Sequence, residues 1–324
     1  MFGAIIGDMV GSVYESHSCK TKKFDIYNLN SRMTDDSYLT LAVAKVLMEH
    51  YPLDYSEESL KTIQEEIAEE FVNQWNMHKT AGFGGMFYQW CFMCSLSGTI
   101  EPAYHSFGNG SAMRISPVGW VADSEEHVKL LSKMVTEITH DHKEGIKGAE
   151  AIAMAIYLAL HGYSKEEIGK TMIEEYYPYI QDLNFDELVE NYTFNTSCQK
   201  SVPQAIYCFL ISDGFEDAIR NCIAIGGDTD TIAAMAGAIA EAYYQKDSLS
   251  DFEQKYLYFM IDPGIEERIK DFYHKIGSKK FEKKCRVDII KTKSIKRVVR
   301  DKPDDPPTTH LVGCQSFYAG NLIK

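Results

Sequence analysis

Apolar residues recur at intervals of three and four along most of this chain, which is the spacing of an amphipathic α-helix. Five segments show it most clearly: residues 35–50, 60–75, 127–140, 143–162 and 201–212. The alternation typical of strands is hard to find before about residue 285, and the connections are rich in Gly, Asn, Asp and Ser, which favour turns. The sequence therefore predicts an all-α fold, a bundle of many helices.

The composition of the chain changes near residue 275. We predict one compact all-α domain over residues 1–275, followed by a basic appendix of unknown role over residues 276–324. The appendix combines short β-branched runs with a proline-containing end, so we expect it to be small and irregular or β-containing. Its basic run from Lys279 to Arg300 is either a solvated face or a docking site for an acidic partner or the polyanionic part of a substrate.

Composition and charge exclude several classes of protein. Eight cysteines lack a repeating spacing and the first residues lack a basic region, so we expect a cytoplasmic protein with reduced thiols. The longest apolar runs, such as residues 151–160, reach about half of the roughly 20 residues that cross a bilayer, so no membrane span is expected. A net charge of −14 argues against direct nucleic-acid binding by the body of the protein.

A cluster of polar residues precedes the most apolar stretch of the chain. Asp228, Asp230 and Thr231 follow a glycine pair, in the first turn of a helix that we expect to begin near Ile232. A single oxygen side chain is enough to cap a helix N-terminus. Two carboxylates and a hydroxyl exceed that need, and anions held together usually have a cation between them. Capping and metal binding both stay open for this segment alone.

A second segment repeats this arrangement. Thr34, Asp35 and Asp36 again stand at the start of an apolar helix. Two helices of one domain that each present a Thr and a pair of Asp could meet across a cleft and supply six oxygen ligands. Such ligands suit Mg²⁺ or Mn²⁺, whereas zinc prefers His and Cys. The pair of motifs predicts a metal site, with room for two ions about 3.5–4 Å apart.

Two further segments have both a structural and a functional interpretation. Residues 107–114, "FGNGSAMR", form a glycine-flanked turn that opens into helical sequence, which is either an ordinary turn or a site where backbone N–H groups approach a phosphate. Glu15 ends the segment "GDMVGSVYE", where it is either a solvated acid at a helix end or a general base near the cleft.

Six motifs together resemble one protein family. They are "GDMVGSVYE", "TDDS", "GNGSAMR", "ITH", "SVPQAIYCFL" and "GGDTDTIAAMAGAIAEAYY". In order and approximate spacing they resemble the ADP-ribosylglycohydrolases, which include dinitrogenase reductase-activating glycohydrolases and ADP-ribosyl-acceptor hydrolases. The likeness is greatest to the branch associated with serine-linked ADP-ribose and poly(ADP-ribose), and it covers about residues 2–275. It implies an orthogonal all-α bundle with a dinuclear magnesium or manganese centre.

The resemblance also implies roles for individual residues. Two Mg²⁺ ions, or alternatively Mn²⁺, are expected to bind Thr34, Asp35, Asp36, Asp228, Asp230 and Thr231. Glu15 matches an acid that lies beside the metals and can close over the site, and His140 matches a histidine beside the ligand. The loop expected to cradle the diphosphate and its flanking ribose consists of Ser106, Phe107, Gly108, Asn109 and Gly110. The chain departs from the family pattern at Ser37, where Thr is frequent, and at Phe107, where Tyr is common.

The implied reaction is metal-dependent hydrolysis of the glycosidic bond between C1″ of the terminal ribose and an acceptor, which releases ADP-ribose. Glu15, Asp35 and Asp228 are the catalytic candidates, and a carboxylate such as Glu15 or Asp228 would accept a proton from the attacking water. The expected partner is an ADP-ribosylated protein, an ADP-ribose polymer or an ADP-ribose-containing small molecule.

Two other functions are kept as alternatives. One is a catalytically inactive ADP-ribose-binding or structural member of the same fold, and the other is a di-metal phosphohydrolase that acts on the diphosphate. Cys91 and Cys94 form a lone CxxC that we interpret as core packing rather than a redox or zinc site. His140 and His142 lack a nearby third ligand of the same kind, so we do not predict a transition-metal site there.

Overall fold

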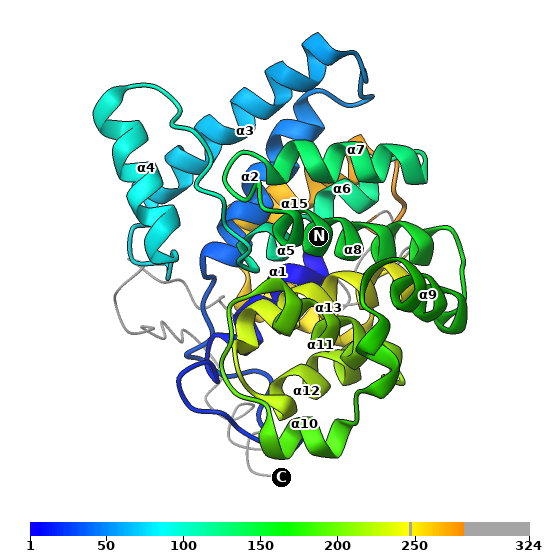
Figure 1. Ribbon diagram of the computed structural model, residues 1–324. Coiled ribbons are helices and arrows are strands. Elements are labelled where there is room, and N and C mark those ends of the chain that lie inside the picture. Colours follow the sequence, from blue (N-terminus) through cyan, green and yellow to red (C-terminus); the bar gives the residue numbers. More distant parts are fainter. Residues whose placement is uncertain (246–247, 282–324) are drawn as a thin grey trace, which may run out of the picture.

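The computed structural model describes residues 1–245 and 248–281, and within these ranges it contains fifteen α-helices and no sheet (Figure 1). The helices are α1 (Phe2–Gly11), α2 (Asp35–Glu49), α3 (Glu57–Met77), α4 (Gly85–Ser97), α5 (Gly110–Met113), α6 (Ser116–Val121), α7 (Glu125–Thr136), α8 (Lys143–Leu160), α9 (Lys165–Thr171), α10 (Phe185–Asn191), α11 (Cys198–Leu210), α12 (Phe215–Ile225), α13 (Thr229–Tyr244), α14 (Asp251–Met260) and α15 (Pro263–Lys275). The all-α prediction is confirmed. Residues 282–324 of the predicted appendix lie outside the described residues.

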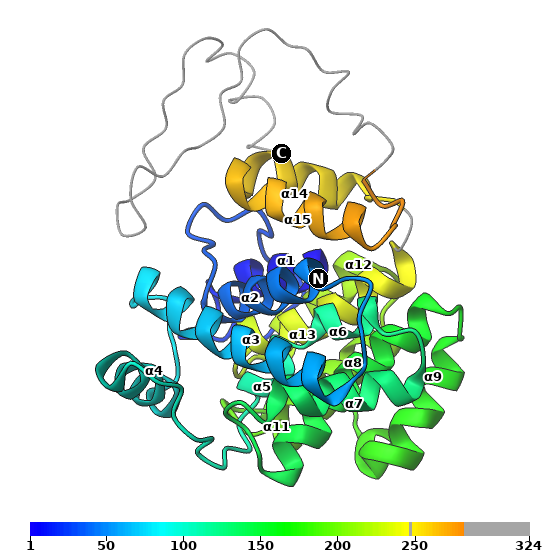
Figure 2. The same ribbon diagram turned by 90° about the horizontal axis from the view of Figure 1, so that it is seen from above.

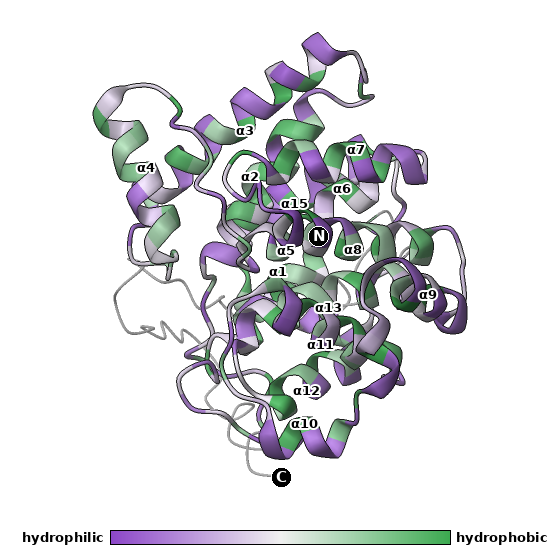
Figure 3. Ribbon diagram, in the orientation of Figure 1, coloured by the Kyte–Doolittle hydropathy of each residue, from purple (hydrophilic) through white to green (hydrophobic). Residues whose placement is uncertain are grey.

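Helix α13 lies at the centre of the molecule. It contacts α1, α2, α5, α8, α11 and α12, and its residues from Thr229 to Ala242 are all buried. In Figure 3, α1 and α13 are coloured as mostly hydrophobic, whereas α3, on the outside, alternates hydrophilic and hydrophobic residues. The Ala-rich composition of α13 suits this position, because small side chains let several helices approach one axis.

Three glycines spaced four residues apart bring α1 directly against α13. A β-carbon built on Gly7 would lie 2.0 Å from the carbonyl oxygen of Ala233, and one built on Gly3 would lie 2.2 Å from that of Gly237. At Gly11 the same construction lies 2.4 Å from the backbone of Asp230. Since no side chain fits between the two backbones, the end of α1 meets the start of α13 at the acidic motif.

The remaining helices cover this central pair. Helix α2 packs against α1 and α3, α15 packs on α2, and α8 lies between α7 and α13. Helix α4 packs on α3 and lies at the edge of the molecule in both views (Figures 1 and 2). Cys91 and Cys94 are buried in the face of α4 that meets the core, as expected for packing residues. None of the helices in the described ranges combines the length and apolarity that crossing a bilayer requires.

Helix boundaries differ from the predicted ones at two places that affect the pocket described below. Helix α13 begins at Thr229, about a turn before Ile232, because Asp228 takes the N-cap position. Helix α7 ends at Thr136, about a turn before His140. The amide N–H groups of Thr139 and His140 both donate to the carbonyl of Thr136, which forms a turn after the helix. His140 therefore lies on a connection, and its ring leaves the face of α7.

Candidate active site

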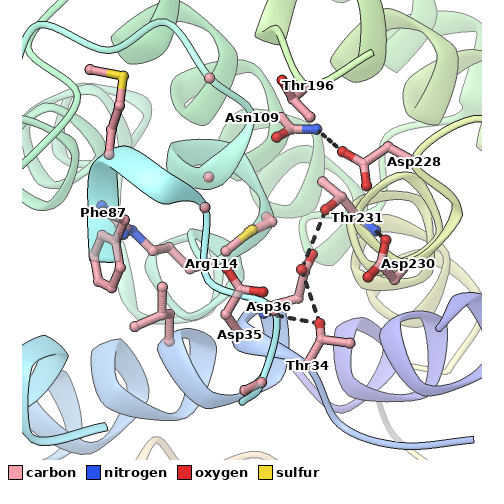
Figure 4. Close-up of a pocket in the computed structure, with 18 of the residues that line it drawn as sticks. Thr34, Asp35, Asp36, Phe87, Asn109, Arg114, Thr196, Asp228, Asp230 and Thr231 are labelled. Carbon is pink, nitrogen blue, oxygen red and sulfur yellow. Dashed lines mark hydrogen bonds between the residues drawn. The ribbon is translucent and has the colours of Figure 1, made fainter. Parts of the chain in front are cut away.

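The two acidic motifs meet at the N-termini of α2 and α13. Thr34 caps α2, where its hydroxyl accepts a hydrogen bond of 3.3 Å from the amide of Asp36. The hydroxyl of Thr231, in the first turn of α13, donates to Asp36 Oδ2 at 3.3 Å and joins the two helices (Figure 4). The polar residues of both motifs thus lie on one side of the contact between α2 and α13, where two helix dipoles present their positive ends.

A pocket of about 420 Å³ opens over this contact, within the size range typical of small-molecule sites. The predicted site residues that line it are Glu15, Thr34, Asp35, Asp36, Ser106, Gly108, Asn109, Gly110, His140, Asp228, Asp230 and Thr231. Phe107 is not among the lining residues. Phe107 is 49% exposed, and the centroid of its ring lies 5.3 Å from that of the His142 ring. His142 is half-buried and caps α8 by accepting from the amide of Glu144 at 3.1 Å.

Asp8 is a site residue that the sequence interpretation missed. It is fully buried on α1 and accepts hydrogen bonds from the amide and hydroxyl of Thr34, at 2.9 and 2.7 Å, and from the amide of Ser37 at 3.2 Å. The hydroxyl of Ser37 also donates to it, so Ser37 keeps the polar contact that a Thr would make there. A lone acid inside an otherwise apolar helix was the available signal, because a buried carboxylate needs partners of this kind.

The carboxylates form two overlapping groups. Oxygens of Asp8, Asp36 and Asp230 lie within 4.8 Å of one another, as do oxygens of Glu15, Asp228 and Asp230. Asp230 belongs to both groups. Asp35 belongs to neither; its carboxylate lies toward Gly82, where a β-carbon would be 3.4 Å from Oδ1.

Burial and mutual repulsion raise the pKa of these acids. Burial, followed by the charge of Asp8, raises the pKa of Asp35 to about 8 and that of Asp36 well above its ordinary value. Burial, followed by Asp36 and Asp228, raises the pKa of Asp230 in the same way. The pKa of Asp8 rises less, to about 6, since its four hydrogen bonds offset part of the effect of burial. Without a cation, ionising all of these groups is therefore unfavourable.

The donor atoms fit a hard divalent cation. Asp36 Oδ1 is buried and has no hydrogen-bond partner among the described residues, which is costly for a carboxylate oxygen without a positive charge nearby. The groups around it offer carboxylate and hydroxyl oxygens, the ligands that Mg²⁺ and Mn²⁺ prefer. Asp8 differs from Asp36, because its oxygens are already engaged by Thr34 and Ser37.

The loop over residues 106–110 is held at the pocket by a segment that the sequence did not single out. The amide of Asn109 donates to the carbonyl of Thr196 at 2.7 Å, and the amide of Cys198 donates to that of Phe107 at 3.0 Å. Thr196 and the exposed Phe194 also line the pocket. The segment carries no motif, so no signal in a single sequence indicated it.

Asn109 connects the loop to the acidic cluster. Its side-chain Nδ2 donates to Asp228 Oδ2 at 2.7 Å (Figure 4). Within the loop, Ser106 Oγ accepts from the amide of Gly108 at 3.0 Å. The loop and the acids therefore form one continuous wall of the pocket.

His140 reaches the pocket from the connection after α7. Its Nδ1 is 2.7 Å from the hydroxyl oxygen of Thr139, which accepts from Arg114 Nη2 at 2.6 Å. A β-carbon on Gly110 would lie 3.2 Å from His140 Nε2, so glycine leaves room for the ring. Burial, reinforced by the charge of Arg114, lowers the pKa of His140 well below its ordinary value. His140 is therefore a neutral hydrogen-bonding group at neutral pH.

Arg114, the last residue of "GNGSAMR", is a buried cation beneath the pocket. Its guanidinium lies over the ring of Phe71, 4.2 Å from the centroid, and near the ring of Phe87 at 5.6 Å. Nε and Nη1 have no hydrogen-bond partner in the described part of the chain. Burial lowers the pKa of Arg114 to about 10, which leaves it charged at neutral pH.

Glu15 lies in the long connection between α1 and α2, at the edge of the pocket. Its side chain is partly exposed, and burial followed by the charge of Asp228 raises its pKa. Farther along this connection, Lys20 Nζ donates to the carbonyls of Tyr192 and Ile225, both at 2.7 Å. The connection is thus fastened beside α12, and Glu15 lies within 4.8 Å of the acids of α13.

Several known proteins are similar to this chain over most of its length. The chain is 27% identical over 322 residues to "ADP-ribosylhydrolase ARH3" from Mus musculus, covering 78% of this chain and 85% of that protein. It is 26% identical over 321 residues to the Homo sapiens protein of the same name, covering 78% and 86%. A shorter match, 28% identical over 160 residues, joins 45% of this chain to 40% of "ADP-ribosylarginine hydrolase Tri1" from Pseudomonas putida.

A solved structure shares the architecture. A chain of an "ADP-ribosylglycohydrolase-related protein complex" superposes with a TM-score of 0.63 and 18% identity, over 85% of this chain and 97% of that one. At this identity the likeness concerns the fold. The ADP-ribosylglycohydrolase family model matches residues 1–278, which include every residue of the pocket. The chain therefore belongs to the ADP-ribosylglycohydrolase family and is an enzyme of that family.

Proposed function

We propose that this enzyme hydrolyses the bond between C1″ of the terminal ribose of an ADP-ribosyl group and its acceptor, releasing ADP-ribose. The acceptor is a protein side chain or an ADP-ribose polymer, and the reaction depends on two Mg²⁺ ions, with Mn²⁺ as the alternative. We place the protein in the cytoplasm. One observation carries the proposal: the N-termini of α2 and α13 bring Asp35, Asp36, Asp228 and Asp230 to the wall of one pocket, where Asp36 Oδ1 has no hydrogen-bond partner among the described residues.

The metal ligands in this proposal come from both motifs. They are Thr34, Asp35, Asp36, Asp228, Asp230 and Thr231, with Asp8 holding the first turn of α2 in place. Divalent cations bound there would supply Lewis acidity and lower the pKa of a nearby water. The membership of Asp230 in both groups supports a site for two ions.

The protein's own groups would orient the substrate and move the proton. The loop over residues 106–110 would contact the diphosphate, because helix α5 begins at Gly110 and has no acid in its first turn. Neutral His140 would hydrogen-bond the ligand without adding charge. Glu15 would accept the proton of the attacking water, since its raised pKa makes it a better base than an ordinary carboxylate.

The buried acids also suit the transition state of such a cleavage. Glycoside hydrolysis passes through an oxocarbenium-like state in which the ribose carries positive charge. Asp228 is held toward the pocket by Asn109, so its charge would stabilise this state without reorganising.

The experiment is hydrolysis of serine-ADP-ribosyl peptide, arginine-ADP-ribosyl peptide and poly(ADP-ribose), each with Mg²⁺ and with EDTA, followed by measurement of free ADP-ribose. We expect Mg²⁺-dependent release from at least one substrate. Release of AMP would instead indicate a phosphohydrolase. ADP-ribose binding without release from any substrate would indicate an inactive binding protein, and either result would contradict the proposal.

A further inference from the structure

The outer face of α4 exposes an unusual number of apolar side chains. We define the α4 face as Met86, Tyr88, Phe92, Met93 and Leu96, which are between 40% and 70% exposed. Tyr88, Phe92 and Leu96 are spaced four residues apart and form one stripe along the helix. Surface apolar residues are usually scattered, and a contiguous patch of this kind marks an interaction site.

The α4 face also lacks charge. Its helix, "GMFYQWCFMCSLS", contains no Asp, Glu, Lys or Arg, whereas neighbouring α3 contains both signs. Figure 3 shows α4 mostly in green and white beside the purple bands of α3. In a chain with a net charge of −14, an uncharged helix face selects an occupant through apolar contact rather than through electrostatic attraction.

The α4 face is continuous with the pocket at its acidic end. The amide of Asp35 donates to the carbonyl of Ala81 at 3.0 Å, and the connection from Ala81 leads directly into α4. Gly82, Gly84, Gly85, Met86 and Phe87 of this stretch line the pocket. Met86 belongs to both surfaces, since it lines the pocket and is 56% exposed.

One of the pocket carboxylates, Asp35, lies beside the start of α4. In the proposed function, the reacting ribose lies at the carboxylates and the diphosphate lies at residues 106–110. The acceptor bonded to this ribose would then lie near the carboxylates, and Asp35 among them adjoins Gly82 and the start of α4.

We infer that the α4 face binds the polypeptide that carries the ADP-ribosyl group, through apolar side chains next to the modified residue. This inference rests on the proposed function and adds the kind of acceptor that the enzyme prefers. An acceptor with only polar flanks would leave Phe92 and Leu96 exposed to water and gain nothing from them.

The test compares three substrates that share the same bond. They are ADP-ribosyl-serine, a serine-ADP-ribosyl peptide with leucines on both sides of the modified serine, and the same peptide with glycines there. For the wild-type enzyme we expect kcat/KM for the leucine peptide to exceed that for the glycine peptide about tenfold. In Phe92→Glu and Leu96→Glu this preference should fall to less than about threefold, through a higher KM.

Two comparisons separate this effect from damage to the enzyme. Neither Phe92 nor Leu96 lines the pocket, so both variants should hydrolyse ADP-ribosyl-serine at the wild-type rate. Tyr163→Glu is the matched control, since Tyr163 is an exposed aromatic residue on the connection between α8 and α9. That variant should keep the preference for the leucine peptide.

Three outcomes would overturn the inference. Equal kcat/KM of the wild type for both peptides, or an unchanged preference in both variants, would show that the face does not bind the acceptor. Sedimentation of the wild type as a dimer that Leu96→Glu dissociates would assign the face to a second copy of the chain. Hydrolysis of ADP-ribosyl-serine in these cases would leave the proposed function intact, whereas no hydrolysis of any substrate would overturn both.

Discussion

Asp230 belongs to both groups of carboxylates, and burial together with Asp36 and Asp228 raises its pKa well above the ordinary value. A side chain in this position opposes folding of the metal-free protein, since ionising it there is less favourable than in the unfolded chain. The same charge is what a bound cation requires. Asp230 thus lowers the stability of the metal-free protein and supplies the charge that binds a cation.

The variant Asp230→Asn tests both effects, on cation-dependent activity and on the stability of the metal-free protein. The substitution keeps the shape of the side chain and removes a charge, so we expect ADP-ribose release to fall at least 10³-fold while the fold is retained. In EDTA the variant should be more stable than the wild type by about 1–2 kcal/mol, because one repelling carboxylate is gone. Urea unfolding in EDTA measures the second effect. A variant that is inactive and also less stable in EDTA would contradict the account.

Replacing Asp8 should lower the stability of the protein, whereas replacing Asp230 should raise it in EDTA. It accepts four hydrogen bonds that position Thr34 and Ser37, so Asp8→Ala leaves several buried donors unpaired. We expect the free energy of unfolding to fall by about 3 kcal/mol or more, with activity lost as well. Asp8→Asn should lose less stability, since its carbonyl oxygen still accepts. Equal stability of the alanine variant and the wild type would show that Asp8 does not anchor α2.

At the scale of helices, the contact between α1 and α13 sets the position of the acids. Gly7→Ala would place a β-carbon 2.0 Å from the carbonyl oxygen of Ala233, and backbone atoms cannot rotate away as a side chain can. We expect a loss of about 3 kcal/mol or more in stability, together with weaker Mg²⁺ binding, because the two helix ends would separate. Thermal unfolding and calorimetric titration with Mg²⁺ measure the two effects.

Gly214→Ala is the control for this substitution. Gly214 caps α12, and no neighbouring atom of residues 1–245 or 248–281 lies within 4 Å of a β-carbon built there. The control should lose less than about 1 kcal/mol and bind Mg²⁺ like the wild type. Similar losses at Gly7 and Gly214 would mean that the close approach of α1 and α13 does not position the site.

The helices themselves could be predicted from the spacing of apolar residues, and the similar motifs at α2 and α13 indicated that two helix starts share a site. Local patterns could not indicate how the helices pack. Asp8 escaped notice because one acid in an apolar run has no periodicity, and Thr196 escaped because its segment carries no motif. The end of α7 at Thr136 was also missed. The helical spacing of apolar residues continues to His140, but the amides of Thr139 and His140 form a turn with the carbonyl of Thr136.

For the whole molecule, the raised pKa values predict how stability depends on pH. Asp8 and Asp35 have folded pKa values of about 6 and about 8, above the ordinary value of 3.8. The folded state therefore holds protons that the unfolded state has already released. The contribution of protonated Asp8 and Asp35 to the free energy of unfolding is complete below about pH 4. It is lost as the pH rises through 6 and 8.

Mg²⁺ should reverse this loss, because a cation favours the ionised carboxylates. We expect the metal-free protein to become less stable between pH 5.5 and pH 8, and the gain in melting temperature from Mg²⁺ to be larger at pH 8. Thermal unfolding with EDTA and with Mg²⁺ at the two pH values is the measurement. A Mg²⁺ effect that is equal at both values, or larger at pH 5.5, would contradict the assigned cluster.

Anomalous X-ray diffraction at the manganese edge, from Mn²⁺-soaked crystals, would measure whether the starts of α2 and α13 together hold two divalent cations. We expect two anomalous peaks in the pocket, one beside Asp36 and one beside Asp228, with Asp230 next to both. Peaks confined to other parts of the molecule, or none in the pocket at a Mn²⁺ concentration that supports hydrolysis, would contradict it.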